Sequence, residues 1–276
     1  MSAEQPGQRR LYYSARKHGV EPLTIQETKE LFVSAYKALD GLFLEAFGVR
    51  GSRGRIADPK AYFLIHTRKK DLWPPANIIF PHFSEDDLFD VIEVLHDVVS
   101  IPRGDGWNGE YDFDKEGGQI RYRDAMNEFL PQYGDGWELS PEGYVLACGP
   151  EGLKDLLAED PPFQSVTNVG DKVNSAITRF RRHGASAEDK MVAVRDLIDA
   201  FEHQRSQAEK VLTEKDAADL FHIANRFGIR HNNPGQQKDY DPDIFHEWLF
   251  YYYLAALRAC ARLLHKESLP SFEEET

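Results

Sequence analysis

The chain has 276 residues, of which 41% are hydrophobic and 29% are charged, the composition of a globular protein with one large domain or two small ones. Its two cysteines, Cys148 and Cys260, are too few for a disulfide framework, so a reducing, cytoplasmic compartment is expected. The net charge of −13 excludes the broadly basic surface of a general nucleic-acid binder, and any RNA contact is expected to use a local basic patch.

Sequence motifs for targeting, membrane insertion and cofactor binding are absent. The first ten residues lack the apolar segment of a signal peptide, and the longest apolar run, Trp248 to Leu257, is too short to cross a bilayer. The sequence has no His-Glu-x-x-His motif, no paired Cys-x-x-Cys motifs and no glycine-rich nucleotide loop. We therefore expect no membrane partner, no metal and no cofactor.

The first half of the chain predicts an α+β domain. Apolar side chains from Leu31 to Phe47 recur at three- and four-residue steps, which predicts a helix over about 25–47 that ends at Gly48. A proline-rich stretch follows, in which no long element is expected, and Ser84 is expected to cap a second helix. The other elements expected in this half are a loop over 103–118, a helix over about 120–130 and a two-stranded hairpin within 136–149.

A stretch rich in proline and acidic residues, 158–164, is the expected boundary between an N-terminal domain, 1–162, and an all-helical domain, 163–276. The first has 18 basic and 28 acidic residues and a net charge of −10, whereas the second has 15 and 18 and a net charge of −3. The four helices expected in the second domain cover about 168–182, the residues after Ser186, about 213–233 and about 242–265. The chain as a whole is therefore expected to be mainly α.

The fourth of these helices is apolar on two sides. One stripe includes Ile244, Trp248, Tyr252 and Ala259, and a second includes Phe250, Tyr253, Leu254 and Leu257. A helix with two apolar faces is expected to be buried on both. The second face would then pack against the N-terminal domain or against another copy of the chain.

The end of the third helix carries the best candidate for chemistry. Arg226 and His231 are separated by four residues, and Arg230 and Asn232 lie next to the histidine. A histidine transfers protons near neutral pH, and an arginine holds phosphate oxygens with a permanent charge. Together these groups suit cleavage of an RNA phosphodiester without a metal, in which the 2′-hydroxyl attacks the phosphorus.

Two interpretations of this motif remain open. On a straight helix, Arg226 and His231 point about 140° apart, and His231 extends the apolar stripe. By this geometry His231 is a core histidine, and the arginines form a solvated face. A helix break before Pro234, or a two-fold dimer that joins two copies of the segment, would instead allow the pair to act together.

Residues 165–266 resemble a HEPN domain, a bundle of four helices with an Arg-x4–6-His motif at the end of the third. The motif here is Arg226-Phe-Gly-Ile-Arg-His231-Asn232, and the aromatic fourth helix is also similar. The resemblance implies a metal-independent endoribonuclease that is a toxin or an abortive-infection effector of antiviral defence. It further implies a homodimer through this domain, with Arg226 and His231 as the catalytic pair.

The resemblance also guides the remaining assignments. Arg230 is expected to bind a neighbouring phosphate, with a solvated helix end as the alternative. Asn232 is expected to bind substrate or orient His231, with a helix C-cap as the alternative. The N-terminal domain is similar in position to domains that sense a trigger or restrain the nuclease, so an antitoxin or a sensor protein is a further candidate partner.

Two other functions are compatible with the same residues. Phe227, where the family often has a polar residue, and the acidic balance favour a non-catalytic HEPN module that binds RNA or a partner protein. Alternatively, the chain is an interaction protein whose N-terminal half is functional and whose helical half only dimerises. Whether Arg226 and His231 converge in a cleft distinguishes the first function from the last.

Overall fold

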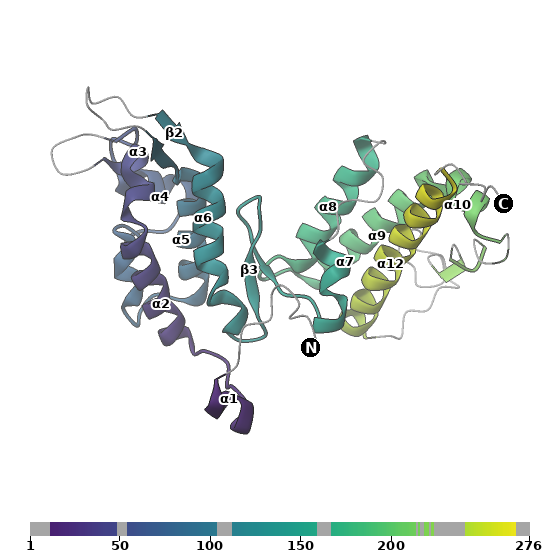
Figure 1. Cartoon of the computed structure of the whole chain (residues 1–276), viewed down its shortest axis with the longest axis horizontal. Helices are drawn as coiled ribbons and strands as arrows, with labels where there is room; N and C mark the ends of the chain where they lie inside the picture. Colours follow the sequence, from purple (N-terminus) through teal and green to yellow (C-terminus); the bar gives the residue numbers. More distant parts are fainter. Residues whose placement is uncertain are drawn as a thin grey trace, which may run out of the picture. The chain divides into compact units, whose positions relative to one another are not determined.

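The computed structural model describes residues 12–48, 54–103, 112–158, 167–213, 215, 218–220, 222–223 and 241–268 (Figure 1). The chain divides into two compact units, Met1–Gly143 (unit 1) and Tyr144–Thr276 (unit 2). Helices dominate both units and the strands are short, which confirms the prediction of a mainly α protein. In the described ranges, no helix has an apolar run long enough to span a lipid bilayer.

Unit 1 begins with α1 (Tyr13–His18), a short helix that buries no residue, followed by α2 (Ile25–Ala38). Thr24 and Glu27 fix the start of α2. The Thr24 hydroxyl accepts a hydrogen bond from the Glu27 backbone N–H at 3.3 Å, and the Glu27 carboxylate accepts one from the Thr24 N–H at 2.8 Å. This reciprocal capping box satisfies two N–H groups that a helix start otherwise leaves unpaired.

The prediction of one continuous helix over 25–47 is wrong, because the structure has three shorter helical elements there. The chain leaves the α conformation at Leu39, with φ −102° and ψ 17°, and continues as a 3-10 turn, η1 (Asp40–Phe43), and α3 (Leu44–Phe47). Aspartate and glycine, the first residues of η1, are poor helix formers, so the break falls where helix propensity is lowest. Gly48, with φ +73°, ends α3 at the predicted position.

The proline-rich stretch contains helices that we did not predict. These are α4 (Pro59–Thr67) and the 3-10 helix η2 (Pro75–Ile79). A proline at the first position of a helix favours its start, and the Asp58 carboxylate accepts a hydrogen bond from the Ala61 N–H at 3.0 Å. The next helix, α5 (Glu85–Val98), begins as predicted at Ser84, which forms a second capping box with Asp87.

In the described residues of the loop predicted over 103–118, the chain forms a small sheet and the start of a longer helix instead. Strand β1 (Ile101–Arg103) pairs antiparallel with β2 (Asp112–Asp114), and α6 (Lys115–Asn127) begins five residues before the predicted helix. Gly118 lies within the predicted loop, but in the structure it lets α6 approach the backbone of Ser100. A Cβ atom at Gly118 would lie 2.6 Å from the Ser100 Cα.

The predicted hairpin is confirmed, since β3 (Trp137–Leu139) and β4 (Val145–Ala147) form a two-stranded sheet after the 3-10 turn η3 (Leu130–Gln132). The Asn127 side chain holds β3 at both polar groups of Leu139, with distances of 3.0 Å and 2.7 Å. The division between units falls within the turn of this hairpin, whereas the predicted boundary at residue 162 lies outside the described residues.

Unit 2 is helical after β4. It contains η4 (Glu151–Leu153), α7 (Lys154–Ala158), α8 (Thr167–Arg181), α9 (Ala187–His203), α10 (Arg205–Val211) and α12 (Pro242–Ser268). Helices α8, α9 and α12 match three of the four predicted helices. A third capping box, Ser186 with Asp189, starts α9 as predicted. Helix α10 was not predicted, and the predicted helix over 213–233 is described only in part.

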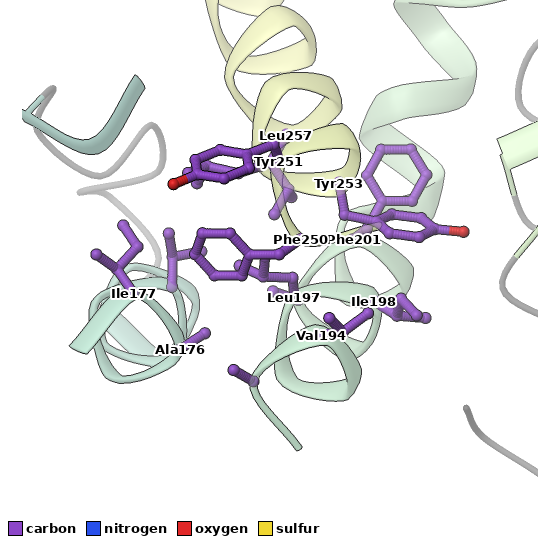
Figure 2. Packing of buried hydrophobic residues seen from close by; sticks show 14 of the residues in the cluster. Ala176, Ile177, Val194, Leu197, Ile198, Phe201, Phe250, Tyr251, Tyr253 and Leu257 are labelled. Atoms are coloured by element: carbon purple, nitrogen blue, oxygen red, sulfur yellow. The ribbon is translucent and has the colours of Figure 1, made fainter. Parts of the chain in front are cut away.

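The core of unit 2 lies between α8, α9 and α12, with α9 packed against the other two (Figure 2). Phe250 of α12 is fully buried and stacks on Phe180 of α8, with ring centroids 3.9 Å apart. Figure 2 shows Phe250 and Leu257 on the side of α12 that faces Leu197 of α9. The side of α12 that contributes Phe250, Tyr253, Leu254 and Leu257 is therefore fully used inside the unit.

Candidate functional site

The four predicted site residues, Arg226, Arg230, His231 and Asn232, lie outside the described residues. What the structure does describe is the chain that leads to them. Residues 218–220 and 222–223 are helical, and both Leu220 and Ile223 pack against the core of unit 2. Leu220 belongs to the apolar stripe predicted for the third helix, and it lies on the core side as that stripe requires.

A buried tyrosine of α12 binds the helical residues 218–220 and 222–223, which we call the anchored segment. The Tyr253 Oη donates a hydrogen bond to the carbonyl oxygen of Leu220 at 2.8 Å. Figure 2 shows the Tyr253 hydroxyl directed away from the other labelled residues of the cluster. Hydrogen bonding allows a buried tyrosine to keep its hydroxyl satisfied and its ring in the core. The backbone six residues before Arg226 is thus held at a defined place on α12.

The side of α12 next to this anchor carries aromatic residues. Trp248 stacks on Tyr252 with ring centroids 5.6 Å apart, and Phe245 meets Trp248 edge-on at 6.2 Å. Burial raises the pKa of Tyr252, and the Asp219 carboxylate of the anchored segment raises it further. The Tyr252 phenol therefore stays protonated at neutral pH.

Arg181 and His246 are two of the basic residues that are buried in unit 2. Arg181 of α8 donates from Nε to the Ala147 carbonyl oxygen at 2.8 Å and so ties α8 to β4. The neighbouring Tyr251 has its pKa raised to about 12 by burial and by Glu247, with Arg181 opposing. Burial lowers the pKa of His246, although a hydrogen bond with the Ala187 backbone opposes the shift, so this imidazole is neutral at the junction of α12 and α9.

Unit 1 contains a groove of about 1020 Å³ between α2 and α6. Small side chains, among them Ser34, Ala35 and Ala38, line the groove and leave space in it. Leu31 and Phe129 contribute apolar surface. Glu128 is the one ionisable residue of its described lining. The groove therefore offers shape and apolar contact, but its lining does not provide an acid–base pair.

A buried histidine in unit 1 is the other titratable group of interest. His96 lies on the core side of α5 with 1% of its surface exposed, and neither ring nitrogen has a hydrogen-bond partner. The hairpin turn covers it: a Cβ atom at Gly143 would lie 2.4 Å from the Nδ1 of His96. Sequence spacing did not identify this residue, but its position four residues after Ile92, on the apolar stripe, is a signal of burial.

His96 is expected to make unit 1 less stable at mildly acidic pH. Burial lowers its pKa; nearby Asp97 and Glu142 oppose the shift, whereas Arg123 and Lys115 add to it. Above the unfolded-state pKa of about 6.5 the imidazole is neutral in both states. As the pH falls below that value the unfolded chain takes up a proton first, so the free energy of unfolding falls until the lower folded-state pKa is reached.

Hydrogen exchange of α5 amides at pH 5 to 8 measures this dependence, and His96→Leu is the matched variant. The leucine fills the site without a titratable group. It should therefore remove the contribution of one proton to the slope of the free energy of unfolding against pH, which is at most about 1.4 kcal/mol per pH unit. His66→Leu, at an exposed position of α4, is the control for the substitution itself. Equal slopes for the wild type and His96→Leu would contradict the assignment.

Comparison with known proteins gives no match, whether with protein-family models, curated proteins or solved structures. The described geometry therefore defines the class of the molecule only as far as a mainly α chain with two compact units. Within it, the anchored segment on α12 is the described feature closest in sequence to the predicted catalytic residues.

Proposed function

We propose that unit 2 is a HEPN-type, metal-independent endoribonuclease domain and that the chain is a cytoplasmic effector of antiviral defence, of the toxin or abortive-infection type. The observation that carries the proposal is the Arg226-x4-His231 motif, which follows the helical residues 222–223 in the sequence. The packing of α8, α9 and α12 around one core, joined by Leu220 and Ile223, supports a four-helix arrangement of that type.

In the proposed reaction the 2′-hydroxyl of RNA attacks the adjacent phosphorus and the 5′-oxygen leaves. His231 moves the protons, and Arg226 stabilises the negative charge that grows on the phosphoryl oxygens. Arg230 binds a neighbouring phosphate, and Asn232 holds the substrate or orients His231. The products are a 2′,3′-cyclic phosphate and a 5′-hydroxyl. The domain acts as a homodimer, and unit 1 is the sensor or the surface for an antitoxin.

His231→Ala is expected to lower RNA cleavage by about 10²- to 10⁴-fold, because the proton-transfer group is lost. The full chain is incubated with labelled RNA in EDTA, and the product ends are identified by their phosphate chemistry. His222→Ala is the matched control: it changes an exposed histidine on the anchored segment and should leave the rate unchanged. Arg226→Lys should lose most of the activity, because lysine keeps the charge but not the guanidinium fork.

Wild-type cleavage rates in both His231→Ala and Arg226→Ala would overturn the catalytic proposal. The alternative, a non-catalytic HEPN module that binds RNA or a partner protein, is favoured by Phe227 within the motif and by the net charge of −13. It predicts that the wild type does not cleave RNA and that binding survives His231→Ala. The two functions are therefore separated by one set of variants.

A further inference from the structure

One side of α12 carries an apolar stripe that the core of unit 2 leaves partly open to solvent. The stripe consists of Ile244, Trp248, Tyr252, Ala255, Ala259 and Leu263. The exposed fractions are 65% for Ile244, 45% for Trp248 and 40% for Leu263, and Ala259 is exposed as well. The helix was predicted to be buried on both apolar faces, but within the described chain only one is fully covered. An apolar surface of this length is typical of a protein interface.

The stripe is complementary to itself. Its six residues form three pairs, and the members of each pair are equally far from the midpoint between residues 253 and 254. Trp248 pairs in this way with Ala259, Tyr252 with Ala255, and Ile244 with Leu263. Two copies of α12 packed antiparallel would place each large ring over an alanine, which lets the helices approach closely. A two-fold axis requires this kind of self-complementary surface.

The charges along α12 favour the same orientation. The exposed ionisable residues near its start are acidic, Asp241, Asp243 and Glu247, and those near its end are basic, Arg262, His265 and Lys266. Asp241 and Lys266 are 25 residues apart, a distance of about 37 Å along a helix, so they cannot meet within one chain. Antiparallel pairing brings the acidic start of one copy to the basic end of the other, whereas parallel pairing would place like charges together.

We propose that this stripe is the contact surface between two copies of the chain, with the two α12 helices antiparallel across a two-fold axis. Trp248 and Tyr252 are the central anchors, each against an alanine of the partner. The surface lies on the side of α12 that carries Trp248 and Tyr252, whose rings stack with centroids 5.6 Å apart. This surface rests on the homodimer of the proposed function but not on RNA cleavage, so the dimer Kd and the cleavage rate test the two separately.

Sedimentation equilibrium of the full chain tests the surface. The expected mass is twice the 31.6 kDa of one chain. Ala259→Glu should raise the dimer Kd about 100-fold or more, because it buries an unpaired carboxylate against Trp248. Ile244→Glu should also weaken the dimer. Ile65→Glu is its matched control, since Ile65 of α4 is 62% exposed and lies in unit 1. A monomeric wild type, or unchanged dimers in Ala259→Glu and Ile244→Glu, would overturn the proposal.

A charge exchange tests the antiparallel orientation. Lys266→Glu should weaken the dimer about 3- to 5-fold, because it places a carboxylate opposite Asp241 of the other copy. Adding Asp241→Asn should recover most of this loss. The asparagine keeps the helix cap, in which the side-chain oxygen accepts from the Asp243 and Ile244 N–H groups at 3.0 Å and 3.3 Å. If Asp241→Asn gives the same change with and without Lys266→Glu, the antiparallel contact is wrong.

Discussion

Replacing Phe250 with alanine is expected to lower the free energy of unfolding of unit 2 by about 3–5 kcal/mol, the range for removing a large buried ring. Phe250 is fully buried and stacks on Phe180 at 3.9 Å, in the region where α8, α9 and α12 meet. Removing the Phe250 ring leaves a cavity, and α8, α9 and α12 would all have to shift toward one another to close it. Native-state hydrogen exchange at the α9 amides measures the change within unit 2.

Phe80→Ala is the control for this variant. It removes the same side chain from a position that is 50% exposed, so it should change stability by less than about 0.5 kcal/mol. A loss below about 1 kcal/mol for Phe250→Ala would mean that the helices of unit 2 do not share one tightly packed core. Because the dimer surface lies on the other side of α12, Phe250→Ala also distinguishes loss of the fold from loss of the interface.

Lys29→Met is expected to destabilise unit 1 by about 1–3 kcal/mol, the cost of removing a partner from buried polar groups. Lys29 is buried in α2, and its Nζ donates to the carbonyl oxygens of Phe83 at 2.5 Å and Phe80 at 3.4 Å. Burial lowers its pKa, while Asp87 opposes the shift. Methionine preserves most of the volume, so the loss reports the hydrogen bonds that hold the loop before α5.

Lys37→Met, at an exposed position of the same helix, should be close to neutral and controls for the loss of charge. Hydrogen exchange at the α5 amides measures both variants. If Lys29→Met and Lys37→Met behave alike, the contacts of Lys29 do not stabilise the loop, and the start of α5 depends on its capping box alone.

The sequence predicted helices well where a capping residue and an apolar stripe coincide. Ser84 and Ser186 each precede such a stripe, and α5 and α9 begin directly after them. The sequence predicted helices poorly where a residue type can either interrupt a helix or be part of one, as proline and glycine can. Pro59 starts α4 although prolines usually interrupt helices, and Gly118 lies within α6 because a larger residue would collide with Ser100.

The candidate site is predictable from local sequence only in its composition. The types and spacing of Arg226 and His231 identify the chemistry, but their convergence depends on the path of the chain between 224 and 240, outside the described residues. The anchor before them was not predicted. Tyr253 belongs to an apolar face, and nothing in its spacing indicates that its hydroxyl meets Leu220. Long-range contacts of this kind depend on tertiary packing, which periodicity does not encode.

The three capping boxes give the two units a common dependence on ionised carboxylates. Hydrogen bonds from Thr24 lower the pKa of Glu27, and those from Ser186 lower the pKa of Asp189. Burial opposes the shift at Asp87, but bonds from Ser84 and Lys69 outweigh it. Their stabilisation is present above the unfolded-state pKa values of about 4 and is lost as the pH falls through the lower folded-state values. Acid thus acts twice on this chain, first below about pH 6.5 through the buried imidazoles of His96 in unit 1 and His246 in unit 2, and then below about pH 4 by loosening the starts of α2, α5 and α9 together.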